Sequence, residues 1–334
     1  MNDGNDPLDL PPTPETLRQL AQNGVLSAAA LERALKMTGH APDTKKWGRF
    51  LDVLLLVLGT GFIVSGVFFF FAFNWAGMHR FLKLGLLEAA ALLAAGAASW
   101  RRLDRLSGKI ALTAAGLLVG ALLALYGQIY QTGADAYELF LTWALLITGW
   151  VLISKFTPLW FVWVLLFDLS LSFYWAQIVG EVNSKLYLWL FLLNGGAIVV
   201  WEAAHARGIE WVKNRWTPRV LALPAFVTLV APTITLIFSN LRERNQDHLL
   251  FLMLALFIGV SAAVLYVYSQ KILDLFMLTV CAFSLIIAFN TWVIEVMEDD
   301  TFLEFLLSAL FVGQAALVVT WLRRVSASWE GRRA

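Results

Sequence analysis

Long apolar segments follow one another from Phe50 almost to the end of the chain. A membrane-spanning helix needs about 20 mostly apolar residues. Segments of that length, separated by short polar stretches, predict ten spans, at 50–73, 81–99, 109–127, 138–154, 157–176, 185–203, 219–239, 248–268, 271–292 and 302–322. The period-two alternation of a β-barrel strand is absent. We therefore expect an all-α fold, a polytopic transmembrane helix bundle, with a membrane domain at 46–323 and a cytoplasmic tail at 324–334.

The first 45 residues have a different pattern. Residues 1–12 are rich in Asp, Asn, Gly and Pro, which predicts a disordered tail. Residues 13–45 predict a small helical hairpin, in which Thr13 and Ser27 cap two helices and Gly24 ends the first. Its apolar seam would consist of Leu17, Leu20, Ala21, Val25, Leu31, Ala34 and Leu35. Because so small a hairpin is marginal alone, we expect it to dock on a protein partner or on the membrane domain.

Composition agrees with this pattern. Of the 334 residues, 59% are hydrophobic and 15% are charged. A soluble domain carries about 25% charged residues, so lipid must be the solvent for much of this chain. The 15 Trp and 24 Phe suit the aromatic belts of a bilayer. A net charge of +1 gives no indication of a nucleic-acid partner.

Basic residues set the orientation. In the ten-span arrangement 20 of the 25 Lys and Arg residues fall on the side of the N-terminus. The other five are Arg80, Lys83, Lys185, Arg242 and Arg244. Lys and Arg concentrate in cytoplasmic loops. The sequence therefore predicts that both termini, and with them the hairpin, are cytoplasmic.

Residue types that carry chemistry are scarce. The single cysteine, Cys281, excludes an internal disulfide, and the four histidines form no pair at metal-ligand spacing, so we expect no metal site. Phosphate-loop, dinucleotide-binding and catalytic-serine motifs are also absent from the sequence. We therefore expect no cofactor and no enzymatic activity, and an intramembrane enzyme stays open as a third alternative to the two hypotheses below.

The most unusual stretch follows the third span, at 126–138, and is polar, aromatic and free of Lys and Arg. Gly116, Gly120 and Ala124 precede it at four-residue spacing, which lets membrane helices approach closely. Continuing that face places Gln128 inside the bundle. Two interpretations remain open for this stretch. One is an ordinary turn with Asp135 as a helix cap and interfacial tyrosines. The other is a periplasm-facing cavity with a polar lining of Gln128, Tyr130, Gln131, Asp135 and Tyr137.

The run YGQIYQTGADAYELFLTWALL, at 126–146, resembles the signature of a bacterial membrane-protein family known as domain of unknown function 2157. The sequence GVLS at the hairpin turn and the Phe73-Asn74-Trp75 step are similar to that family too. The likeness extends from about Thr13 to Trp175. It implies a multi-pass location in the bacterial inner membrane and implies no reaction.

Polar residues within the spans form a second candidate set. Asp168 lies in the middle of the fifth span, and Asn194, followed by two glycines, in the middle of the sixth. Asp168 is either part of a proton or cation relay with Glu88 or a hydrogen-bonded carboxyl that ties two helices together. The glycines after Asn194 either unwind the helix to bind an ion or permit close packing. Glu202 and Asp274, near span ends, are expected at the interface.

Two hypotheses for function follow. The first is binding or transport of a small solute or lipid through a cavity that opens to the periplasm, with Asp168 and Asn194 contributing to the ligand site. The second is a structural or regulatory role in which the hairpin recruits a cytoplasmic protein.

Overall fold

The structure, a computed structural model, describes residues 13–38, 77–213, 215–239, 247–297 and 301–333, together with isolated positions between 47 and 76. The chain divides into two compact units, Met1–His79 and Arg80–Ala334. Every regular element among the described residues is a helix, which confirms the all-α class. The predicted tail at 1–12 and most of the first predicted span lie outside the described residues.

The first unit contains the predicted helical hairpin, formed by α1 (Pro14–Gln22) and α2 (Ala28–Met37). Both predicted caps form, because the Thr13 side chain accepts from the Thr16 amide and the Ser27 side chain from the Ala30 amide. Gly24 has a φ of +75°, which only glycine adopts readily, and it lies in the turn that ends α1. Leu17 is the one buried residue of the two helices.

In the second unit, eight helices are long and apolar enough to cross a membrane among the residues described. They match the second to the ninth predicted spans: α4 (Arg80–Arg101), α5 (Leu106–Tyr130), α6 (Ala136–Ser154), α7 (Thr157–Tyr174), α8 (Ser184–Ala206), α9 (Trp216–Phe238), α11 (Leu249–Gln270) and α12 (Leu275–Met297). The tenth predicted span lies within α13 (Thr301–Arg333), so the helix continues through nearly all of the predicted tail.

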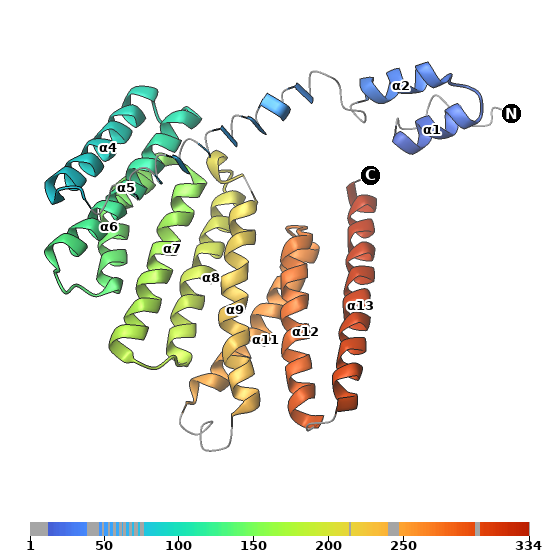
Figure 1. Ribbon diagram of the computed structural model, residues 1–334. Coiled ribbons are helices and arrows are strands. Elements are labelled where there is room, and N and C mark those ends of the chain that lie inside the picture. Colours follow the sequence, from blue (N-terminus) through green and yellow to red (C-terminus); the bar gives the residue numbers. More distant parts are fainter. Residues whose placement is uncertain are drawn as a thin grey trace. The chain divides into compact units, whose positions relative to one another are not determined.

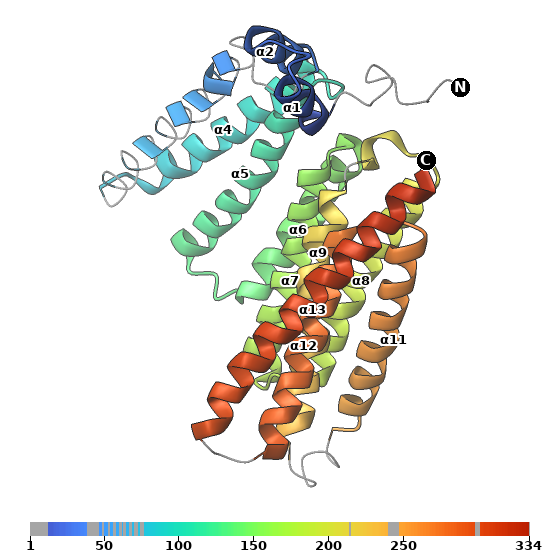
Figure 2. The same ribbon diagram turned by 90° about the vertical axis from the view of Figure 1, so that its right-hand side faces the viewer.

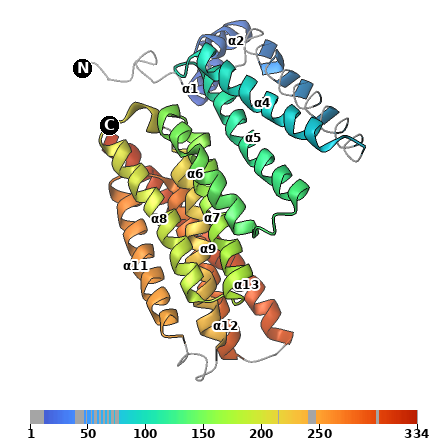
Figure 3. The ribbon, with the colours of Figure 1, turned by 90° about the vertical axis from the view of Figure 1, so that its left-hand side faces the viewer.

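The helices of the second unit form two groups (Figure 1). In the first group α4, α5, α6 and α7 pack in chain order, with α4 and α5 as a pair at one edge (Figure 3). Its core includes Leu112 from α5, Ile147 from α6 and Leu159 from α7. In the second group α9 contacts α8, α11 and α12 and is the most buried of the eight spans. Helix α13 packs on α12 and crosses the outer face of this group (Figure 2).

The two groups meet where α7 faces α8, a boundary that we call the α7–α8 seam. The packing of α7 on α8 is less extensive than that of α7 on α6 or of α8 on α9. The buried cores on either side are separate clusters. Several of the candidate sites described below lie along this seam.

Candidate functional site

The turn between α5 and α6 carries the signature run. Helix α5 ends at Tyr130, and its C-cap residue, Gln131, has a φ of 45°. Gly133 also has a positive φ, of 66°. Asp135 occupies the N-cap position of α6 with extended backbone angles, as predicted. Its side chain makes no capping hydrogen bond, however. The backbone of this turn thus follows the predicted cap geometry, whereas another group must satisfy the first amides of α6.

That group comes from the end of α7. Here the chain continues as a short π-helix, η1 (Trp175–Val179), which presents Gln177 to the start of α6. The Gln177 side-chain oxygen accepts a hydrogen bond from the Tyr137 amide at 3.3 Å. The Ser170 hydroxyl donates to the Tyr137 carbonyl at 3.0 Å, and the Tyr174 ring packs edge-to-face on that of Tyr137, with centroids 5.2 Å apart. Residues of α7 and η1 therefore fix the position of Tyr137.

Gln128 does not lie inside the bundle, so that prediction is wrong. Its side chain is exposed, as are those of Tyr130 and Gln131. The reason is geometric: a row of residues four apart rotates by about 40° around a helix at each step. Gly116 and Gly120 are buried, but the row has turned away from α6 by the time it reaches Gln128. Asp135 and Tyr137 are half-buried.

Gly116 and Gly120 of α5 have the packing role that was predicted, whereas Ala124, the third residue of that row, is exposed. The Trp143 indole of α6 lies against Gly120, and its N–H donates to the Gly116 carbonyl at 2.7 Å. A Cβ added at Gly120 would overlap the indole ring. Close approach of α5 and α6 therefore depends on one glycine and one tryptophan, and the pairing of that tryptophan with the glycines was not evident from the sequence.

A groove lies beside the signature turn, on the α7–α8 seam. It has a volume of about 600 Å³ and is bounded by α6, α7 and α8. Tyr137, Ser170 and Tyr174 line it, and the remaining lining residues are apolar, among them Leu171 and Trp189. Of the predicted site residues, Tyr137 is the one that lines this groove. The arrangement suits an apolar occupant with a polar group held near the tyrosines.

Asp168 and Asn194 meet across the same seam. The Asn194 side-chain amide donates to the Asp168 carboxylate at 2.8 Å and to the Leu190 carbonyl at 3.0 Å. Asn194 is fully buried. The Ser172 hydroxyl donates to the backbone carbonyl of Asp168 and not to its carboxylate. The structure thus contains a hydrogen bond that ties two helices together through Asp168, as one of the two interpretations of this residue predicts.

A relay between Asp168 and Glu88 and an unwound helix after Asn194 are both contradicted by the described residues. Helix α8 is continuous from Ser184 to Ala206, so its backbone keeps the helical form after Asn194. Glu88 is exposed on α4. Helices α5 and α6 lie between α4 and α7 (Figure 1), so Glu88 is not brought to Asp168.

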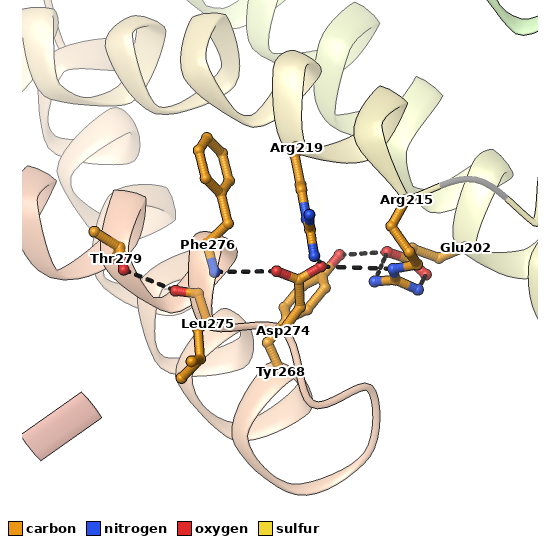
Figure 4. A network of polar contacts seen from close by, with 8 residues as sticks. All are labelled: Glu202, Arg215, Arg219, Tyr268, Asp274, Leu275, Phe276 and Thr279. Carbon is orange, nitrogen blue, oxygen red and sulfur yellow. Dashed lines mark hydrogen bonds and ion pairs between the residues drawn. The ribbon is translucent and has the colours of Figure 1, made fainter. Parts of the chain in front are cut away.

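At the opposite end of the bundle, a network of charges joins α8, α9 and the α11–α12 turn (Figure 4). Arg215, at the start of α9, forms a two-pronged ion pair with Glu202 of α8, at 2.9 and 3.0 Å. The Tyr268 hydroxyl of α11 donates to the same carboxylate at 2.9 Å. Glu202 and Asp274 were expected at the interface, but nothing in the sequence indicates that they share an arginine.

Asp274 is the buried centre of this network. Its carboxylate lies 3.0 Å from Arg219 and 3.5 Å from Arg215, and it accepts from the Phe276 amide at 3.0 Å as the cap of α12. Leu273, immediately before it, has a φ of 58°, an unusual conformation for a bulky residue. The two arginines balance the two carboxylates in charge, and the network links α8, α9, α11 and the turn before α12.

Comparison with known proteins gives one result. No curated protein and no solved structure matches the chain. Residues 18–160 match a family model described as predicted membrane protein (DUF2157), within the stretch of about Thr13 to Trp175 where the sequence resembled that family. The match begins within α1, includes α2 and α4 to α6, and ends within the first turn of α7. Over this N-terminal part, the chain is therefore similar to a family of predicted membrane proteins whose function is unknown.

Proposed function

We propose that this multi-pass protein of the bacterial inner membrane binds a membrane lipid in the groove on the α7–α8 seam. The observation that carries the proposal is the groove itself, about 600 Å³ in volume, with apolar walls and two tyrosines beside the signature turn. Ligand sites have volumes of about 300–1,000 Å³ and are mostly apolar with a few polar groups. Lipid is the most abundant apolar molecule around membrane-spanning helices.

The lining favours a lipid over a polar solute. A polar solute needs several hydrogen-bonding groups around it, because an unpaired polar group is costly to bury. Gln128, Tyr130 and Gln131 are exposed and stand outside the groove lining. Tyr137, Tyr174 and Ser170 provide hydroxyl groups along one part of the wall. An acyl chain along the leucines, with its ester near the tyrosines, satisfies both kinds of surface.

Orientation is part of the proposal. With both termini in the cytoplasm, as the 20 Lys and Arg residues on that side favour, the signature turn faces the periplasm. The groove then belongs to the outer leaflet. Fusions of green fluorescent protein and of alkaline phosphatase to the C-terminus test this: only the fluorescent fusion should be active.

Native mass spectrometry tests the lipid site. The full chain, extracted from bacterial membranes in a mild detergent, should retain bound phospholipid. Leu171→Trp, which fills the groove, should reduce the retained lipid about tenfold. Leu165→Trp is the matched control, because Leu165 is on the same helix but 43% exposed and outside the groove. Equal lipid retention by the two variants would count against the proposal.

The hairpin supports a second candidate, recruitment of a cytoplasmic protein. Val25 and Met37 are 63% and 89% exposed, and α1 and α2 bury little apolar surface between them. Such a surface is typical of a docking element. If so, a chain without residues 1–45 should fail to complement a strain that lacks the gene, although the full chain complements it. The membrane domain of the shortened chain should keep its helical circular dichroism spectrum. An unchanged phenotype would contradict this function.

A further inference from the structure

A second cavity lies on the α7–α8 seam and is distinct from the groove beside the signature turn. It has a volume of about 300 Å³ and lies between α7, α8, α9 and the short helix η2 (Glu210–Val212). Four tryptophans contribute to its wall: Trp160, Trp163, Trp201 and Trp211. The Trp160 and Trp211 rings are stacked with centroids 5.8 Å apart, and Trp201 meets Trp211 edge-on at 5.4 Å.

Three buried polar atoms of this wall have no hydrogen-bond partner among the residues that the structure describes. They are the indole nitrogens of Trp160 and Trp201 and the hydroxyl oxygen of Thr217. Trp201 is 7% exposed and Thr217 is 1% exposed. By contrast, the Trp163 indole, in the same wall, donates to the Thr148 hydroxyl at 3.0 Å.

Such groups are rare, because buried polar atoms in folded proteins are nearly always hydrogen-bonded. One such atom can be an accident of packing. Three on the wall of one cavity, drawn from α7, α8 and α9, indicate a partner that occupies the cavity.

The chemistry of the three atoms defines that partner. An indole N–H can donate a hydrogen bond but cannot accept one, so the wall offers at least two donors. The other lining residues are apolar or aromatic and carry no charge. We propose that this cavity binds an apolar molecule through its carbonyl oxygens, which accept from Trp160, Trp201 and Thr217. A phospholipid ester and the headgroup of a membrane quinone both have this chemistry.

The charge network beside the cavity keeps its walls in place. Glu202 directly follows Trp201 on α8, and Arg215 precedes Thr217 by two residues at the start of α9. The ion pair between Glu202 and Arg215 therefore fixes the ends of the two helices that carry two of the three polar atoms. A preformed wall of this kind reduces the ordering that binding requires.

Ligand-dependent thermal unfolding of the full chain in detergent tests the proposal. Circular dichroism is the readout, with decylubiquinone or dioleoyl phosphatidylglycerol as the added ligand. The variants are Trp201→Phe, which removes an N–H and keeps an aromatic ring, and Thr217→Val. Trp292→Phe is the matched control, on the exposed face of α12. At least one ligand should raise the Tm of the unmodified chain.

Trp201→Phe and Thr217→Val should each weaken binding of that ligand roughly fivefold, because each removes one hydrogen bond to it. Trp292→Phe should leave the binding affinity unchanged. A response to the quinone alone or to the phospholipid alone supports the site and identifies the source of the carbonyl. The proposal is overturned if neither ligand raises the Tm, or if Trp201→Phe and Thr217→Val bind as tightly as the unmodified chain.

Discussion

The charge network around Arg215 predicts that substitutions of its two arginines lower the free energy of unfolding by different amounts. Arg215 is 24% exposed and its partner Glu202 is 16% exposed, and the two make a two-pronged ion pair. Arg215→Met removes both bonds and leaves the Glu202 carboxylate with the Tyr268 hydroxyl. Loss of one partner from a buried pair costs about 3–5 kcal/mol, because the remaining charge is desolvated and unpaired. We expect Arg215→Met to lose an amount in that range.

Arg219→Met should cost far less. The Arg219 side chain is 43% exposed, so water already screens its interaction with Asp274. Asp274 also keeps Arg215 at 3.5 Å and the Phe276 amide at 3.0 Å after the substitution. An ion pair with one exposed partner contributes about 1 kcal/mol or less. The two arginines, four residues apart, should therefore differ by at least about 2 kcal/mol.

Equilibrium unfolding by sodium dodecyl sulfate in mixed micelles measures these differences. The double variant Glu202→Gln with Arg215→Met removes the stranded charge together with its partner. It should be more stable than Arg215→Met alone. If Arg215→Met and Arg219→Met cost the same, or if the double variant is the least stable of the three, the charge network does not tie the helices as described.

Two further predictions concern the membrane interior. Gly120→Ala should lower the free energy of unfolding by about 1–3 kcal/mol in the same assay, because the added methyl overlaps Trp143. Gly149→Ala on α6, where an added Cβ meets nothing within 4 Å, is its control and should be neutral or slightly stabilising; an equal loss from both would refute the packing argument. Asn194→Leu removes the side-chain amide that donates to Asp168 and should lower the free energy of unfolding by about 1–2 kcal/mol. Asp168→Asn keeps an acceptor oxygen and should cost less. The reverse order would contradict the hydrogen bond between these two side chains as the link between α7 and α8.

The apolar pattern was sufficient to predict the helices, because a spanning helix is specified by the length and composition of one segment. The second to ninth spans lie where the sequence placed them. Contacts between helices depend on which faces meet, and the sequence of one segment does not show which face of another helix it will contact. Gln128 illustrates the error, since its row of small residues was extended two steps beyond the contact with α6. Gln177 illustrates the omission, since nothing in its own segment shows that a π-helix turns it toward Tyr137.

The α7–α8 seam gives these observations a common explanation. Within each group the helices pack through large apolar clusters, but α7 and α8 share less extensive packing and are joined near mid-span by the Asp168–Asn194 hydrogen bond. The groove and the tryptophan-lined cavity both lie on this seam, and Leu193 lines both. A hydrogen bond between side chains orients two helices without requiring them to fill the space on either side. The polar pair thus holds the two groups together while leaving room along the seam for apolar molecules.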